Sequence, residues 1–255
     1  MVDLARYMYA VSRPFEDGAL AAPVTGIAEG RIDTVRHRNL VAIVSDVDLS
    51  EFGEAALRAN LEQLAWLETV ARAHHRVVQA VSSASPTAPL RLGTICLDDD
   101  GVRRRLAEWH DRLERVLDRV QGRREWSVKV LAPAHRETVA ATATTPTGGA
   151  DYLRRKKAQA EAKLTAGQGA ARAAARLHEV LGAAAVAART FPAQDPALSG
   201  RRGTMLLNAA YLVPADGIGA FQACVDAARA EVPDLVIDSQ GPWPPYAFAM
   251  LDSDD

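Results

Sequence analysis

Three of the histidines, His74, His75 and His110, are candidate functional residues, because a neutral imidazole can bind a metal ion or act as a general base. His74 and His75 are adjacent, so on a helix they point to different sides and do not hold one ion together. His110 sits beside Trp109 in a second helical segment. A metal centre needs several converging ligands, and the spacing of these residues supplies none. We therefore expect each histidine to be a structural or a surface residue.

The acidic run Asp98-Asp99-Asp100-Gly101 is a candidate site for a hard cation, since Ca²⁺ prefers oxygen ligands. A calcium loop also needs further ligands at set spacing and a distal carboxylate, whereas Val102 and three arginines follow here. The same residues are typical of a helix N-terminus, with a capping aspartate and an acidic first turn. We expect a helix cap at this position.

Neither cysteine has the surroundings of a catalytic thiol. Cys96 and Cys224 are flanked mainly by apolar or small residues, which is typical of a buried, inert thiol. Gly148-Gly149 lacks the Lys-Ser/Thr that follows a phosphate-binding loop, and no three glycines have the dinucleotide-binding spacing. The sequence therefore predicts no catalytic residue, no metal site and no cofactor, and we expect a protein that is not an enzyme.

Four consecutive cations, Arg154-Arg155-Lys156-Lys157, are the candidate for partner binding. They fall near the start of a predicted helix, where the macrodipole disfavours positive charge. Successive helical side chains spread by about 100°, so all four do not face inward. Two interpretations remain open: a solvated helical face, or a site that recruits an acidic partner surface.

A second unusual segment is Gly241-Pro242-Trp243-Pro244-Pro245-Tyr246. Its three prolines fix φ and force a stiff, extended path, which holds Trp243 and Tyr246 in set positions. The segment suits a proline-rich ligand of another domain, but we favour aromatics that pack inward while the prolines guide the chain into a last strand.

The composition of the whole chain is that of a globular protein. It has 255 residues, 48% hydrophobic and 24% charged, with 30 basic and 32 acidic residues. This excludes wholesale disorder and a polycation, so we expect no nucleic-acid partner. No apolar run approaches the ~20 residues of a membrane span, and the N-terminus does not resemble a signal peptide. We expect a soluble, cytoplasmic protein of one large or two small domains.

Hydrophobic patterns predict the elements of the first half. Apolar and β-branched runs predict strands at 7–11, 25–29, 40–44, 90–97 and 126–130. The strand at 25–29 is the weakest of these predictions. A helical stripe runs from Leu57 to Val81, and a second helix follows Asp98 and ends at Gly122. This order favours an antiparallel sheet with helices on one face, in the α+β class. A ferredoxin-like plan is the nearest simple arrangement.

Residues 138–149 change in character, since threonines, glycines and a proline make this segment a linker candidate. We therefore predict an N-terminal domain at 1–137 and a smaller α+β domain at 150–255. An alanine-rich stretch at about 150–190 predicts a projecting helical arm, a hairpin with Gly167-Gln168-Gly169 at its turn or kink. Beyond the arm we expect strands at 206–213, 235–238 and 246–251 and a helix at 220–231.

The proline-rich segment, extended from Gln240 to Phe248, strongly resembles the C-terminal motif of the gas vesicle protein F and L family. Further family motifs follow in the same order along nearly the whole chain: Tyr7-Met8-Tyr9-Ala10-Val11, Pro89-Leu90-Arg91-Leu92-Gly93-Thr94-Ile95, Glu125-Trp126-Ser127-Val128-Lys129-Val130, Asp151-Tyr152-Leu153-Arg154-Arg155-Lys156 and Asn208-Ala209-Ala210-Tyr211-Leu212-Val213. The motif residues that we interpret as structural are Tyr9, Arg91, Gly93, Thr94, Trp126, Lys129, Tyr152 and the six residues from Gly241 to Tyr246. Leu92 and Gln240 are small departures from the family pattern.

The resemblance implies an accessory role in gas vesicle formation. Members of the family look like minor, non-enzymatic vesicle components that engage the small hydrophobic shell protein, gas vesicle protein A, and limit its aggregation or assist nucleation of the shell. The implied fold is a modified ferredoxin-like N-terminal domain plus an α+β C-terminal domain with coiled-coil-like helices. The implied partners are shell protein A and other gas vesicle proteins, and the implied location is the cytoplasm and the gas vesicle.

A different class of function stays open beside this one, because one fold hosts many functions. A ferredoxin-like sheet also suits an enzyme or a sensor of a small ligand. Such a protein would place a cluster of titratable residues on facing elements, and the sequence shows no such cluster. The assembly role needs no chemistry, because a sheet edge or a groove is enough to cover the apolar patches and strand edges of a shell subunit.

Overall fold

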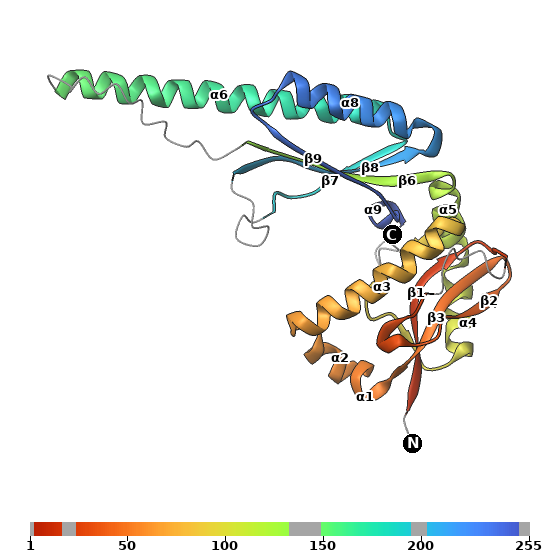
Figure 1. Cartoon of the computed structure of the whole chain (residues 1–255). Helices are drawn as coiled ribbons and strands as arrows, with labels where there is room; N and C mark the ends of the chain where they lie inside the picture. The colour runs from red at the N-terminus through yellow and green to blue at the C-terminus, as the bar shows by residue number, and fades with distance from the viewer. Residues whose placement is uncertain (1–2, 17–23, 133–148, 195–202, 250–255) are drawn as a thin grey trace. The chain divides into compact units, whose positions relative to one another are not determined.

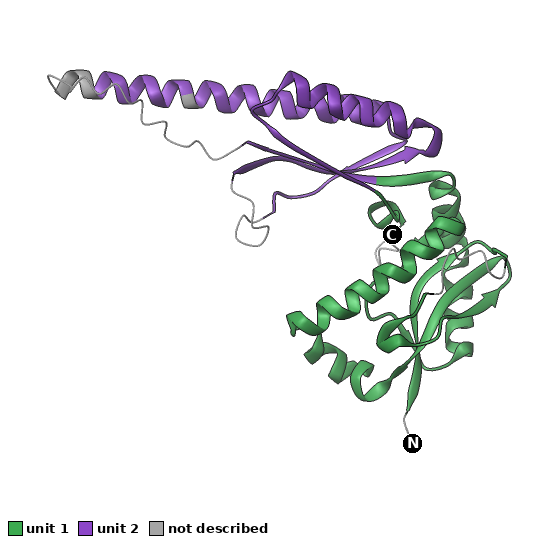
Figure 2. Cartoon of the chain, in the orientation of Figure 1, with its two compact units in different colours: residues 1–125, 242–255 green, residues 126–241 purple. Residues whose placement is uncertain are grey.

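The computed structural model of the chain describes residues 3–16, 24–132, 149–194 and 203–249. The chain forms two compact units: Met1–Glu125 together with Pro242–Asp255, and Trp126–Gly241 (Figure 2). The chain therefore passes from one unit to the other twice. The boundaries between the units lie after residues 125 and 241, whereas the sequence predicts domain boundaries at 137 and 150. Of the predicted linker 138–149, all residues except Gly149 lie outside the described residues.

The first unit is built on an antiparallel sheet whose central strand is β1 (Figure 1). The strand order is β2-β3-β1-β4, and β5 also pairs with β1. The strands of this sheet are β1 (Leu4–Ser12), β2 (Asp33–His37), β3 (Leu40–Asp48), β4 (Thr87–Pro89) and β5 (Ile95–Cys96). The long β1–β3 pairing confirms the two strands that the sequence predicts most strongly.

Helices cover both faces of this sheet. Met8 and Val44 pack with α4 (Asp99–Glu108) and α5 (His110–Val120), whereas Tyr7 and Ile43 pack with α3 (Leu64–Ala84) on the other side. The expectation of helices on one face is therefore wrong. Both predicted strands are continuous apolar runs without alternation, and such runs are typical of strands that are buried on both faces.

The helical stripe from Leu57 to Val81 does not form one helix. The chain folds instead into α1 (Leu49–Phe52), α2 (Glu54–Asn60) and then α3, with a break at residues 61–63. The later positions of the stripe are buried as predicted, but Leu64 is 79% exposed. Leu61 and Leu64 keep the helical spacing but are exposed, so spacing alone does not show where α3 begins.

The remaining elements of the first unit correct three further expectations. Residues 25–29 form a single bridge, Thr25 with Arg31, and the short 3₁₀ helix η1 (Ile27–Glu29) in place of a strand. Residues 90–97 hold a turn, with β4 before it and β5 after it. The second helix is divided at Trp109 into α4 and α5.

The second unit contains a sheet with the order β7-β8-β6-β9. Its strands are β6 (Arg123–Ala132), β7 (Ala187–Thr190), β8 (Thr204–Pro214) and β9 (Val236–Trp243). The end of α6 (Gly149–Ala183) and α8 (Ile218–Glu231) lie on the same side of the sheet, and the 3₁₀ helix η2 (Ala215–Gly217) precedes α8 (Figure 1). Leu181 and Phe221 pack there against Tyr211 of β8, in a core that also buries Trp126 of β6.

The long helix α6 differs from the predicted arm in two ways. It continues through Gly167-Gln168-Gly169 without a turn, so the predicted hairpin is wrong. It also ends at Ala183, and the last part of the predicted arm is strand β7. Alanine is the best helix former, and its density on both sides of the two glycines keeps the helix intact. No helix in the described part of the chain is long and apolar enough to cross a membrane.

The C-terminal segment also differs from its prediction. Of the expected strand at 246–251, residues 246–249 form the short helix α9 (Tyr246–Ala249), and residues 250 and 251 lie outside the described residues. The strand before it reaches Trp243. Pro244 and Pro245 separate the two elements. The backbone N–H groups in the first turn of a helix have no acceptor within the helix, and proline has no such N–H group. Paired prolines therefore suit the start of a helix better than a place inside a strand.

Candidate functional site

His74 is a structural histidine. Its side chain is buried in the first unit, and its Nδ1 lies 3.0 Å from the hydroxyl oxygen of Tyr7. The imidazole also packs against the ring of Tyr9, with 5.6 Å between the ring centroids. Burial, with a smaller contribution from the charge of His75, lowers the pKa of His74 to about 4. The side chain is therefore neutral near pH 7.

The carboxylates of the acidic run point to separate partners. The backbone N–H of Gly101 donates to Asp98 Oδ1 at 2.6 Å, which confirms the predicted cap of α4. Asp99 accepts from Arg6 Nε at 2.8 Å, and Asp100 pairs with Arg103. Three carboxylates that are each engaged elsewhere do not converge on a cation, as the helix-cap interpretation requires.

The other candidate chemical groups are also dispersed. Cys96 is buried, and burial raises the pKa of its thiol, which disfavours the nucleophilic thiolate. Cys224 is partly buried beside the core of the second unit. His110 Nε2 lies 3.1 Å from Asn39 Oδ1. Within the described residues, no three His, Cys, Asp or Glu side chains gather where they could hold a metal ion.

The C-terminal motif packs inward, within the first unit. The ring of Trp243 lies 5.6 Å from that of His75, and the ring of Tyr246 stacks on the same imidazole at 5.9 Å. The hydroxyl of Tyr246 lies 3.2 Å from His75 Nδ1. The backbone N–H of Ala247 donates to Glu125 Oε2 at 2.7 Å. Two aromatic side chains of the motif, one on each side of the paired prolines, thus contact the same imidazole of α3.

The mid-chain motif forms a turn that is bonded to β1. Gly93 has φ +77°, in the left-handed region that favours glycine, and its N–H donates to the hydroxyl of Tyr7. Thr94 closes the turn, because its hydroxyl donates to the carbonyl of Arg91 at 2.7 Å. Tyr9 extends the same network, since its hydroxyl accepts from the N–H of Ile27. These motif residues therefore tie the turn and η1 to the central strand.

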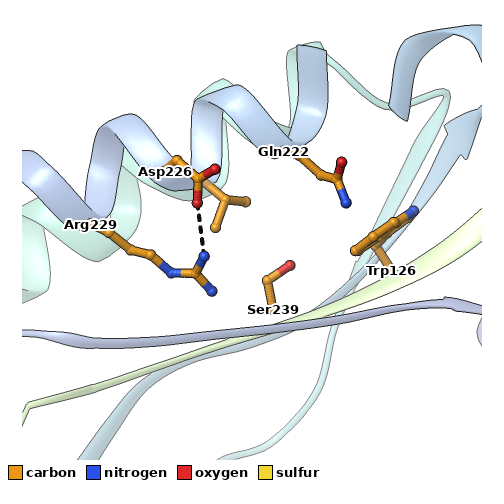
Figure 3. A pocket seen from close by; sticks show the side chains of 6 residues that line it. Trp126, Gln222, Asp226, Arg229 and Ser239 are labelled. Carbon is orange, nitrogen blue, oxygen red and sulfur yellow. Dashed lines mark hydrogen bonds and ion pairs between the residues drawn. The ribbon is translucent and has the colours of Figure 1, made fainter. Parts of the chain in front are cut away.

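Sequence reasoning missed a pocket in the second unit, between α8 and the sheet (Figure 3). Its lining includes Trp126, Gln222, Asp226, Arg229 and Ser239. Gln222, Asp226 and Arg229 follow one another at helical spacing, which is the signal that could have placed them together. The guanidinium of Arg229 already donates to Asp226 and to the carbonyl of Ile237. The pocket therefore contains an internally satisfied ion pair rather than an open charged group.

The predicted cluster of cations lies near the N-terminus of α6. All four side chains, from Arg154 to Lys157, are exposed, and Lys157 Nζ lies 3.9 Å from Glu161 Oε1. Tyr152 belongs to the same helix, but its side chain lies outside the described residues. Lys129, another motif residue, donates to Gln194 in the second unit. The positions of the cations suit both a solvated face and a partner site.

Comparisons of the sequence with known proteins identify the family. The family of the gas vesicle synthesis protein GvpL/GvpF matches residues 5–250. The chain is 41% identical to gas vesicle protein L of a Streptomyces species, over 99% of this chain and 96% of that protein. It is 27% identical to gas vesicle protein F2 of Halobacterium salinarum, over 92% of this chain and 88% of that protein.

The fold agrees with these matches. The crystal structure of the gas vesicle protein GvpF from an Anabaena species resembles this structure with a TM-score of 0.69, over 98% of this chain and 97% of that one. The two sequences are only 17% identical, so this likeness concerns the fold, a mixed α/β arrangement of two antiparallel sheets and helices. The family match spans almost the whole chain, which therefore belongs to the gas vesicle GvpL/GvpF family.

Proposed function

We propose that this chain binds gas vesicle shell protein A and, through that contact, limits its aggregation or assists nucleation of the shell. Family membership establishes the coarser role, that of an accessory protein of gas vesicle formation. The proposal adds the partner and the mode of action. It also assigns the protein to the cytoplasm and to the vesicle as a minor component without enzymatic activity.

The single observation that carries the proposal is the exposed, basic half of α6. From 153 to 169 each residue whose burial is described is exposed, although Leu153 and Leu164 are large apolar residues. A helix with this exposure gains little from packing within its own chain, because most helical stability in proteins comes from tertiary contacts. The proposal treats α6 as a coiled-coil-like arm for a partner and the first unit as a modified ferredoxin-like scaffold.

The cluster from Arg154 to Lys157 gives the proposed contact its electrostatic part. We infer that it recruits an acidic surface on shell protein A or on another gas vesicle protein. Exposed ion pairs contribute only about 0.2–1 kcal/mol each, so one substitution has a small effect. Four together speed the encounter with an acidic partner, and this attraction weakens as salt screens it.

Co-purification with tagged shell protein A tests the proposal. The full chain and shell protein A are expressed together, and the soluble fraction of shell protein A is compared with its fraction when it is expressed alone. We expect this chain to co-purify with shell protein A and to raise its soluble fraction. An unchanged soluble fraction, with no chain retained on the tagged partner, would contradict the proposal.

A further inference from the structure

Among its described residues, only the C-terminal part of α6 packs against its own unit. Near its C-terminal end, α6 packs against the sheet of the second unit through Ala174, Leu177 and Leu181. His178, between them, lies 2.7 Å from the hydroxyl of Tyr211 through its Nδ1. These contacts fix which side of the helix faces the core, and residues 153–169 extend far beyond them (Figure 1).

The apolar residues of the exposed half form a side of their own, because at about 100° per residue Leu153 and Leu164 are turned by roughly 80–100° from Leu181. Counting back from Leu181 at steps of three and four gives His178, Ala174, Ala171, Gly167, Leu164, Ala160, Lys157 and Leu153. Steps that average 3.5 residues are the heptad spacing of helices that pack side by side. We call the apolar and glycine members of the exposed part of this series, Leu153, Ala160, Leu164, Gly167 and Ala171, the α6 stripe. Lys157, which is also exposed, lies at the edge of the stripe.

The α6 stripe has the two features of a helix-packing surface. Leu153 is 66% exposed and Leu164 is 64% exposed, so two large apolar side chains face water on one side of the helix. A Cβ added at Gly167 would meet no atom of the described residues within 4 Å, so packing among them does not explain this glycine. Glycine inside a helix costs roughly 0.5–1 kcal/mol relative to alanine, and small residues allow a second helix to approach closely.

Cations flank the α6 stripe. At about 100° per residue, Lys156 and Lys157 lie on opposite sides of the line through Leu153 and Leu164. Coiled-coil partners are selected by charges at such flanking positions, so these lysines favour a helix with acidic flanks. Two copies of α6 satisfy this rule only in part. An antiparallel pair that aligns Leu153 with Leu164 would place Lys156 opposite Glu161 but Arg154 opposite Lys163, and a parallel pair would place each cluster against itself.

We propose that the α6 stripe binds an amphipathic helix of another protein, one with a Leu/Ala face and acidic flanks, to form a two-helix coiled coil. This inference rests on the proposed function and names the chemistry of its partner. A membrane surface fits less well, because interfacial helices need a broad apolar face and the α6 stripe has two large apolar residues. The partner helix lies along residues 153–171 with its acidic side chains beside Lys156 and Lys157.

The experiment measures the binding of a labelled synthetic peptide to the full chain by fluorescence anisotropy. The peptide has about 20 residues, Leu and Ala at heptad positions and Glu on both flanks; a twin peptide has Lys on the flanks. One variant removes the apolar face (Leu153→Gln with Leu164→Gln). Its matched control places glutamines on the opposite side (Ala158→Gln with Thr165→Gln). Circular dichroism first shows that each variant remains folded.

We expect the wild type to bind the Glu-flanked peptide, with an affinity that falls as salt is added. The double Leu→Gln variant binds about tenfold more weakly, whereas the matched control binds like the wild type. Reversal of the four cations from Arg154 to Lys157 to glutamate transfers binding to the Lys-flanked twin. Failure of the wild type to bind the Glu-flanked peptide, or equal binding by both double variants, would overturn the inference.

Two further measurements examine the other occupants. Sedimentation velocity tests self-association, and flotation with vesicles of phosphatidylglycerol and phosphatidylcholine tests a membrane surface. Dimers or vesicle binding that disappear in the double Leu→Gln variant would overturn the inference. Shell protein A is measured in parallel: if it binds the wild type and this variant equally, the inference fails and the proposed function stands. If the Glu-flanked peptide binds and shell protein A does not, the proposed function fails alone.

Discussion

The buried imidazole of His74 makes the stability of the protein depend on pH. In the unfolded chain its pKa has the ordinary value of 6.5, and in the folded protein it is about 4. Between these values the unfolded state binds a proton that the folded state does not bind, so stability falls as pH falls from about 6.5 to about 4. At pH 4.5 this loss amounts to about 2–3 kcal/mol relative to pH 7.

Urea unfolding at pH 7 and pH 4.5 measures this loss. His74→Gln removes the titrating group, so the variant is less stable at pH 7 but loses less stability than the wild type at pH 4.5. The difference between the two losses isolates His74 from the other groups that titrate in this range. Equal losses in the two proteins would show that His74 is not held neutral by burial.

A comparison of Gly93, in the mid-chain turn, with Gly122, between α5 and β6, distinguishes the cost of backbone strain from the cost of a side-chain clash. Both have positive φ, +77° and +67°, so alanine costs about 1–2 kcal/mol at either position for its backbone conformation. A Cβ at Gly93 would also lie 2.9 Å from Leu57 Cδ2, whereas a Cβ at Gly122 would meet no atom within 4 Å in the part of the chain that the structure describes. We expect Gly93→Ala to lower the free energy of unfolding more than Gly122→Ala. Equal values from urea unfolding would contradict the described contact between the turn and α2.

At the scale of elements, the C-terminal motif shows what sequence patterns predict well. The prolines between Trp243 and Tyr246 restrict the backbone, which a sequence displays directly, and both rings contact His75. The secondary structure beyond Tyr246 does not follow, because a short apolar run has no period long enough to distinguish strand from helix. Contacts with His75 and Glu125, far away in the sequence, are part of what holds α9 in place.

Trp243→Ala tests the structural role of this motif. The ring is half-buried against His75, so we expect a loss of about 1–3 kcal/mol, less than the 3–5 kcal/mol of a fully buried tryptophan. Phe191→Ala, which removes an aromatic side chain that is 38% exposed, is the control and should cost less. Thermal unfolding measures both. An unchanged melting temperature with lost binding to shell protein A would instead make the motif a partner ligand.

The helix α6 shows where local patterns mislead. Two glycines separated by a single residue, Gly167 and Gly169, predict a turn, since glycine is unfavourable inside a helix. Alanine on both sides outweighs this cost, and the helix continues through them. The exposure of residues 153–169 could not be read from the sequence either, because it depends on where the sheet of the second unit ends.

Gly169→Ala tests the continuity of α6 without touching the α6 stripe. Among the described residues, a Cβ at this position would meet no atom within 4 Å, so alanine should stabilise the helix by roughly 0.5–1 kcal/mol. The reverse substitution one turn earlier, Ala166→Gly, should destabilise it by a similar amount. Circular dichroism melts measure both variants. Loss of helicity in Gly169→Ala would contradict a continuous helix and favour a turn at this glycine.

At the scale of the whole molecule, the two compact units could not be derived from the order of elements. The sequence predicts the first domain boundary in the Thr- and Gly-rich segment at 138–149. In the structure the first unit ends at Glu125 and also includes Pro242–Asp255, and the second unit begins at Trp126. Such a division depends on contacts between distant parts of the chain. The order of the family motifs, by contrast, is a property of the sequence itself, and it identifies the family correctly.

The most direct test of the whole account measures gas vesicle formation in cells that lack this protein. The cells receive either the wild-type chain, the variant with Arg154, Arg155, Lys156 and Lys157 replaced by glutamate, or a control. The control reverses four exposed cations of the first unit, Arg58, Arg72, Arg103 and Arg104. Pressure-sensitive light scattering reports the vesicles, because hollow shells stop scattering when they collapse. The account predicts that the wild type and the control restore vesicles and that the α6 variant, although folded and equally abundant, does not. Equal restoration by all three would contradict it.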